Sequence, residues 1–240
     1  MVPPRVETES ASIVINGAFN PAIFSSAWFL SEQLIGRKEY DAMQVQLISR
    51  DLTSIELGWL RVQATSDSFQ ASTADAEEYE RLRDVAIGVL RTLPHTPVGA
   101  LGVNHDAHYL VDSEESWHRL GDLLSPKKLW QEALSLPGMA DITVWGVRPD
   151  KYGGRIQVSV QPSQRLAHGI FISCNDHFEL EEALTQPMTR QEMVRAAPGV
   201  EATPGKNRIA RVILAEEWDL CRERWKTIVS TILSQLEESS

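Results

Sequence analysis

Two stretches of the sequence, SIVINGAFN at residues 12–20 and VGALGVNHDAHYLV at residues 98–111, are the first strand candidates of two halves of the chain. Both are rich in β-branched and apolar residues, which favour strands. Each contains a similar polar step, Phe19-Asn20-Pro21 in the first stretch and Val103-Asn104-His105 in the second. The two stretches are therefore expected to begin two similar structural units.

Helix and strand patterns follow each stretch in the same order. In the first half they lie at residues 25–35, 43–49, 55–65, 68–73 and 75–93. In the second half they lie at residues 112–124, 142–147, 155–161, 169–175 and 216–236, with a short extra helix at 127–136. Asp75 with Glu78, and Asp112 with Glu115, have the spacing of capping boxes, which predicts helix starts at both places.

Each half thus has the order β-α-β-β-β-α, and agreement element by element indicates an internal repeat. Coincidence between two generic halves is the alternative. The pattern predicts an α+β fold, in which two repeats form one curved antiparallel sheet with helices on one face. This arrangement resembles a TATA-binding-protein-like saddle. The resemblance concerns the fold pattern alone, and it implies no particular activity.

The predicted boundaries follow from this repeat. Residues 1–11 are expected to be a frayed N-terminus, residues 12–97 the first repeat and residues 98–240 the second. The second repeat carries a Pro/Gly-rich insertion at about 183–209, for which the first half has no counterpart. Within it we predict a short helix at 189–197, followed by an exposed, mobile segment at 196–207.

Charge and composition restrict the classes of function. The chain of 240 residues has a formal net charge of −10, which disfavours non-specific binding to nucleic acids and anionic membranes. It has two cysteines, no run of roughly 20 apolar residues and no apolar signal-peptide core near its start. We expect a cytoplasmic protein.

Motifs of phosphate-binding loops, dinucleotide-binding folds, serine hydrolases and zinc proteases are absent from the sequence. No cofactor is therefore expected. The leading hypothesis is a non-enzymatic protein-binding or assembly module of a cytoplasmic complex. An enzyme or metal-dependent site is the first alternative, and a nucleic-acid-binding saddle is the second.

The enzyme alternative depends on polar residues near predicted strand ends. His105 and Asp106 lie in the first such cluster, and Cys174 and His177 lie in the second. If the two strand ends were neighbours, these four residues could form a zinc site, although their spacing matches no known structural zinc pattern. Cys174 with His177 could also be a nucleophile and its base. Ordinary turn, cap and packing roles are the alternative.

The binding hypothesis predicts a contact surface on the open face of the sheet and in the insertion. Trp145 is expected to face outward, because Ile142 and Val144 occupy the inward phase of their strand. An exposed tryptophan on a polar sheet face is typical of a protein contact. The other residues of the predicted contact surface are Gln157, Ser159, Gln161, Met188, Arg190, Met193 and Arg195.

Overall fold

Alternating side chains in two long central strands set the two faces of the sheet. Strand β1 (Arg5–Gly17) buries Ala11, Ile13 and Ile15 on one side, and strand β6 (Val98–Leu110) buries Val103 and Ala107 on the same side. The two strands pair antiparallel over almost their whole length, with a register shift near each end. This pair occupies the centre of the sheet and joins the two halves of the chain.

The computed structural model describes residues 4–180, 191 and 201–236, and in these the sheet has nine antiparallel strands. Their order is β2-β3-β4-β5-β1-β6-β9-β8-β7. The first-half strands are β2 (Met43–Ile48), β3 (Leu52–Leu57), β4 (Leu60–Thr65) and β5 (Ser68–Thr73). The second-half strands are β7 (Ile142–Val147), β8 (Gly153–Pro162) and β9 (Gly169–Glu179).

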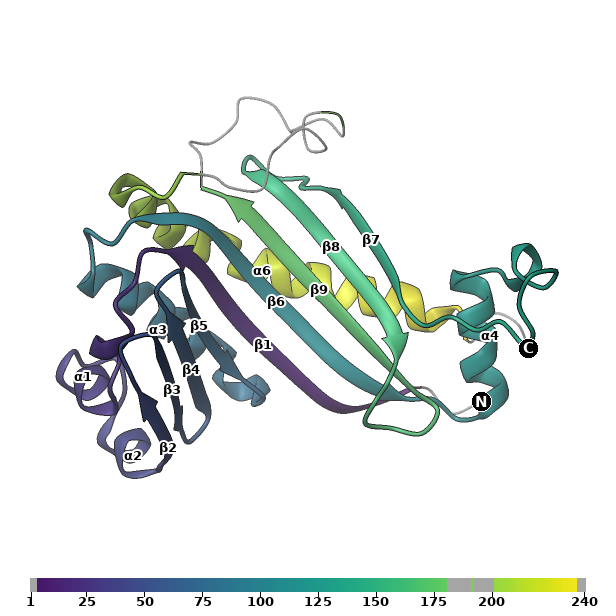
Figure 1. Cartoon of the computed structure of the whole chain (residues 1–240), viewed down its shortest axis with the longest axis horizontal. Coiled ribbons are helices and arrows are strands. Elements are labelled where there is room, and N and C mark those ends of the chain that lie inside the picture. Colours follow the sequence, from purple (N-terminus) through teal and green to yellow (C-terminus); the bar gives the residue numbers. More distant parts are fainter. Residues whose placement is uncertain (1–3, 181–190, 192–200, 237–240) are drawn as a thin grey trace.

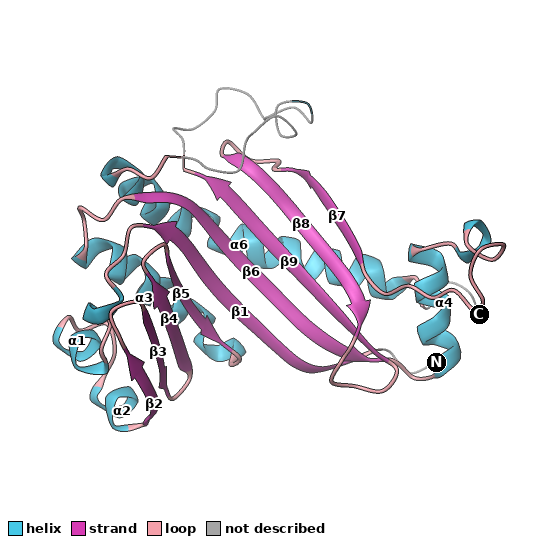
Figure 2. Cartoon of the chain, viewed as in Figure 1, coloured by secondary structure: helices cyan, strands magenta, loops and turns pink. Residues whose placement is uncertain are grey.

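The longest helix, residues 204–234, lies behind the sheet in the view of Figure 1, and shorter helices lie at both ends of the sheet, as Figure 2 also shows. The α-helices are α1 (Ser26–Ser31), α2 (Arg37–Asp41), α3 (Tyr79–Thr92), α4 (Glu114–Leu124) and α6 (Pro204–Ser234). Short 3-10 turns are η1 (Pro21–Ile23), η2 (Ala76–Glu78) and η3 (Lys127–Leu129). No helix in the described ranges has the length and apolar character that crossing a membrane requires.

Helix α6 connects two hydrophobic clusters. Its first half buries Ile213, Leu214 and Trp218 in a large cluster shared with α3 and the first-half strands. Its second half places Trp225 in a smaller cluster with α4 and strand β9. At 31 residues the helix is about 46 Å long, which lets one element cover both halves. The Asn207 amide secures its start by donating to the carbonyl of Leu93, 3.0 Å away.

The α+β class, the antiparallel sheet and the helices on one face agree with the prediction. The predicted strand at 55–65 is instead two strands, β3 and β4, which reverse direction at Gly58. Gly58 lies in the tight turn between them and has a φ of +65°, a conformation that residues with a Cβ rarely adopt. Buried and exposed residues alternate on both sides of this turn, so the sequence pattern resembles that of one long strand. The first half therefore has four strands after its first helix, one more than predicted.

Three predicted boundaries are wrong. Residues 5–11 were expected to fray, but they belong to β1, because β6 extends far enough to pair with them. The last helix begins at Pro204, twelve residues before the predicted start at Glu216, so the expected mobile segment ends in helix. The extra helix predicted at 127–136 is reduced to η3 and turns. The helix predicted at 189–197 lies, except for residue 191, outside the described residues.

Replacing Trp225 tests whether α6 is part of the core. Trp225 is 7% exposed and its ring stacks on His105 at a centroid distance of 6.1 Å. We expect Trp225→Ala to lower the free energy of unfolding by about 3–5 kcal/mol, as measured by urea denaturation. Leu220 on the same helix is 52% exposed, so Leu220→Ala is the control and should change stability by less than about 0.5 kcal/mol. Equal effects of the two substitutions would contradict this assignment of the buried face.

Candidate functional site

The face of the sheet away from the helices carries a continuous row of mostly polar residues. Register pairs connect one residue of each of eight neighbouring strands: Glu56, Arg61, Ser72, Ser12, Asn104, Asn175, Gln157 and Trp145. At about 4.8 Å between strands, the part from Ser72 to Trp145 extends over roughly 24 Å. We call this set the open-face row.

Hydrogen bonds order the centre of the open-face row. The Asn104 amide donates to the Ser12 hydroxyl at 3.2 Å, and the Asn175 amide donates to the Asn104 carbonyl oxygen. Arg61 forms an ion pair with Glu56 at 2.5 Å, so the charges at that end of the row compensate each other. The row therefore presents fixed donors and acceptors with little net charge, on a chain whose formal charge is −10.

A second, shorter row lies beside the first. Ser10, Asp106, Ser173, Ser159 and Thr143 are register neighbours on consecutive strands. The Ser10 hydroxyl donates to the Asp106 carboxylate at 2.6 Å, and the hydroxyls of Thr143 and Ser159 are 2.8 Å apart. The two rows give the open face a dense supply of hydroxyl, amide and carboxylate groups.

One end of the open face is hollowed by a cavity of about 440 Å³. It lies where β5 ends while β1 continues, so no strand among the described residues pairs with Thr8–Ser10 on that side of β1. The tip of the β3–β4 hairpin, including Trp59 and Arg61, forms another wall. Asp106 and Arg165 also line the cavity, so both signs of charge are available inside it.

The structure places four residues of the predicted contact surface on the open face. Trp145 and Gln157 are in the open-face row, Ser159 is in the second row, and Gln161 pairs with Phe171 one row farther. Trp145 is 43% exposed, in agreement with its expected outward direction. Met188, Arg190, Met193 and Arg195 lie outside the described residues.

The four candidate metal ligands are divided between the two faces of the sheet. His105 and Cys174 are register partners on the helix-covered face, and both are buried. Asp106 directly follows His105, and His177 lies three residues after Cys174. Because side chains alternate along a strand, both point to the open face, where their register partners are Ser173 and Gly102. Within the described ranges, no group of three or more potential ligand residues is placed to hold a metal ion.

The same division separates the proposed nucleophile from its base. Cys174 lies on the helix-covered face and His177 on the open face, so the imidazole cannot accept the thiol proton. Burial raises the pKa of the Cys174 thiol to about 12, and the nearby Asp176 carboxylate acts in the same direction. A cysteine with this environment is protonated at neutral pH and is a poor nucleophile.

His105 is enclosed by aromatic rings on the helix-covered face. Tyr79, Trp218 and Trp225 surround it at centroid distances of 5.9–6.1 Å. Neither ring nitrogen has a hydrogen-bond partner among the described residues. Burial lowers the pKa of His105 to about 4, so the ring is neutral at physiological pH. Its position is that of an aromatic core residue.

A buried ion-pair network lies beneath strand β9. The Arg148 side chain is fully buried and donates to Asp176 at 3.1 Å and to Asp150. Its guanidinium carbon is 3.5 Å from the centre of the Phe178 ring. Arg224 on α6 contacts the same Asp176 carboxylate. Arg148 therefore anchors the β7–β8 connection beneath the sheet and is unavailable for contact with a nucleic acid.

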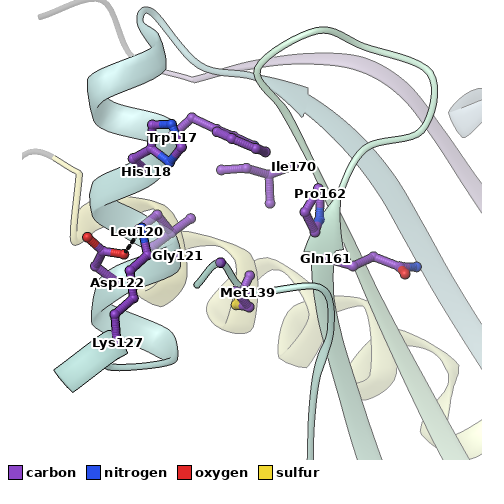
Figure 3. Close-up of a pocket in the computed structure, with 11 residues that line it drawn as sticks. Trp117, His118, Leu120, Gly121, Asp122, Lys127, Met139, Gln161, Pro162 and Ile170 are labelled. Carbon is purple, nitrogen blue, oxygen red and sulfur yellow. Dashed lines mark ion pairs between the residues drawn. The ribbon is translucent and has the colours of Figure 1, made fainter. Parts of the chain in front are cut away.

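A smaller cavity of about 70 Å³ lies between α4 and the ends of β8 and β9 (Figure 3). Apolar side chains line most of it, including Trp117, Leu120, Met139 and Ile170. The Trp117 indole N–H donates to the carbonyl of Gly169 at 3.0 Å and thereby fixes α4 against β9. Both cavities were missed by sequence reasoning, because their walls come from four or more separate segments.

Breaking the buried network should be costly. Asp176→Asn removes the carboxylate that Arg148 and Arg224 share, and we expect a loss of about 3–5 kcal/mol in the free energy of unfolding, measured by urea denaturation. The exposed ion pair of Lys151 with Glu216, at 2.9 Å, provides the control. Lys151→Ala should leave the free energy of unfolding almost unchanged, because exposed ion pairs are screened by solvent. A stability unchanged by Asp176→Asn would show that the network is dispensable.

No protein-family model matches the chain, and no curated protein is significantly similar to it.

Proposed function

We propose that this chain is a non-enzymatic protein-binding or assembly module, acting in a cytoplasmic complex through the open face of its sheet. The observation that carries the proposal is the open-face row. Its hydrogen-bonding groups are ordered by one another and lie along register-paired strands. Within the described residues, the long helices α3 and α6 pack on the other face.

The chemistry of the open face suits a protein partner. Amide and hydroxyl groups can pair with a partner's backbone and polar side chains, and Trp145 supplies a large apolar anchor at one end. The cavity at the other end accepts a protruding side chain, with Asp106 and Arg165 available for either sign of charge. The roughly 24 Å between these ends matches the extent of an ordinary protein contact.

The other candidate functions lack such support. The open-face row has one arginine, Arg61, and its charge is compensated by Glu56. Phosphate binding needs several uncompensated basic groups on one surface. The enzyme alternative needs His105, Asp106, Cys174 and His177 in one place, and they lie on two faces.

We also infer that the two halves arose by duplication and form a saddle of the TATA-binding-protein type. Outward from the centre, the first half runs β1-β5-β4-β3 and the second runs β6-β9-β8-β7, so corresponding strands occupy corresponding places. Strand β2 is an addition at one edge. The aromatic residues of the two long helices do not occupy equivalent positions, because Tyr79 begins α3 and Trp218 lies in the middle of α6.

Affinity capture with one variant at the cavity and one at the Trp145 end of the open-face row tests the binding proposal. Proteins captured from a lysate of the source cells by the wild-type chain are compared with those captured by Trp145→Ala and by Ser72→Arg. We expect Trp145→Ala to weaken a genuine partner by on the order of thirtyfold, because buried aromatic anchors dominate interface energies. Ser72→Arg should abolish capture by filling the cavity.

Leu220→Ala serves as the control, because Leu220 is exposed on the helical side of the molecule. It should leave capture intact, and thermal melting should show that all three variants are folded. Capture of the same proteins by wild type and both open-face variants would refute the proposal. Equal loss with the Leu220 control would place the contact on the helical side.

A further inference from the structure

The end of the molecule around α4 and β7 exposes an unusual amount of apolar surface. In the connection between these elements, residues 125–141, Leu129 is 83% exposed and Leu136 is 98% exposed. Trp130 and Leu134 in the same connection are about half exposed. Figure 1 shows this connection projecting beyond the sheet, at the end where β7 begins.

The adjoining elements add to this surface. Leu123 at the end of α4 is 53% exposed, and Val144 of β7 is 61% exposed. With Trp145, seven large apolar side chains are thus uncovered, which leaves on the order of 700 Å² of apolar surface at roughly 100 Å² each. Monomers rarely expose so much in one region, and one partner of a stable interface contributes about 800 Å².

Strand β7 is also an unprotected sheet edge. It is last in the strand order, and in the described part of the chain no strand pairs with its outer side. Residues 142–147 include no charged residue and no proline, and the pairing of β7 with β8 has no register shift. Proteins usually protect exposed edges with such features. At the opposite edge, the pairing of β2 with β3 does contain a register shift, after Met43.

We propose that this edge binds a second copy of the chain, with the two β7 strands antiparallel across a two-fold axis. Self-pairing brings each side chain opposite a residue of an identical strand, so like charges would repel there. Because β7 contains no charged residue, its pairing with an identical strand creates no such repulsion. The pairing also satisfies the outer backbone groups of β7, and it sets each exposed connection beside the end of the other copy's β7.

The arrangement has a consequence for the open face. A two-fold axis perpendicular to the sheet keeps corresponding faces on the same side, so the two nine-stranded sheets become one. The two open-face rows then lie end to end, with a Trp145 from each copy near the seam. The dimer goes beyond the binding function proposed above, which a monomer could also perform.

The mass of the purified full chain in solution tests the proposal. Sedimentation equilibrium should show reversible assembly to twice the chain mass of 26.9 kDa. Val144 points to the helix-covered side of β7, away from the open-face row. Val144→Lys places like charges near each other at the seam and should raise the dissociation constant by on the order of a hundredfold.

Leu47→Lys is the matched control. Leu47 is 52% exposed in the other uncharged edge strand, β2, and its substitution should leave the dimer intact. A wild-type chain that stays monomeric at about 100 µM, where interfaces of this size are populated, overturns the proposal. The proposal is also overturned if Leu47→Lys dissociates the dimer and Val144→Lys does not. If the Val144→Lys chain is monomeric and still captures the partner, dimer formation and partner binding are shown to be separate properties.

Discussion

The antiparallel pairing of β1 with β6 is the constraint on which the rest of the structure depends. These strands come from different halves of the chain, and their pairing makes one sheet of two sets of strands. Because side chains alternate along a strand, the pairing also assigns every neighbouring residue to one of two faces. The face with Ile13, Val103 and Ala107 must be covered, and α3 and α6 cover it.

The covering helix also explains the buried polar groups. Helix α6 crosses from one hydrophobic cluster to the other, and Arg224 on its second half contacts Asp176 beneath the sheet. Arg148 pairs with the same carboxylate from the β7–β8 connection. Two arginines around one buried carboxylate are favourable only when the geometry is fixed, so the network ties helix, strand and connection to one arrangement.

The open face and the exposed edge follow from the same geometry. Residues such as Asn104 and Asn175 stay uncovered because they alternate with core residues, and the strand register brings them into one row. The β7 end lies beyond the part of the sheet that α6 and α4 enclose, so Val144 stays exposed although it shares the helix-covered face. The proposed binding surface and the proposed dimer seam are therefore adjacent, and Trp145 belongs to both.

The sequence by itself determined the α+β class, most strand positions and the outward direction of Trp145, because each depends on local periodicity. It could not locate Gly58 as a reversal, since alternation continues on both sides of the turn. It also could not predict which residues from separate segments of the chain lie close together. The division of His105 and Cys174 from Asp106 and His177, the burial of Arg148 and both cavities were decided by tertiary structure, because strand register and the path of α6 depend on contacts between residues far apart in the chain.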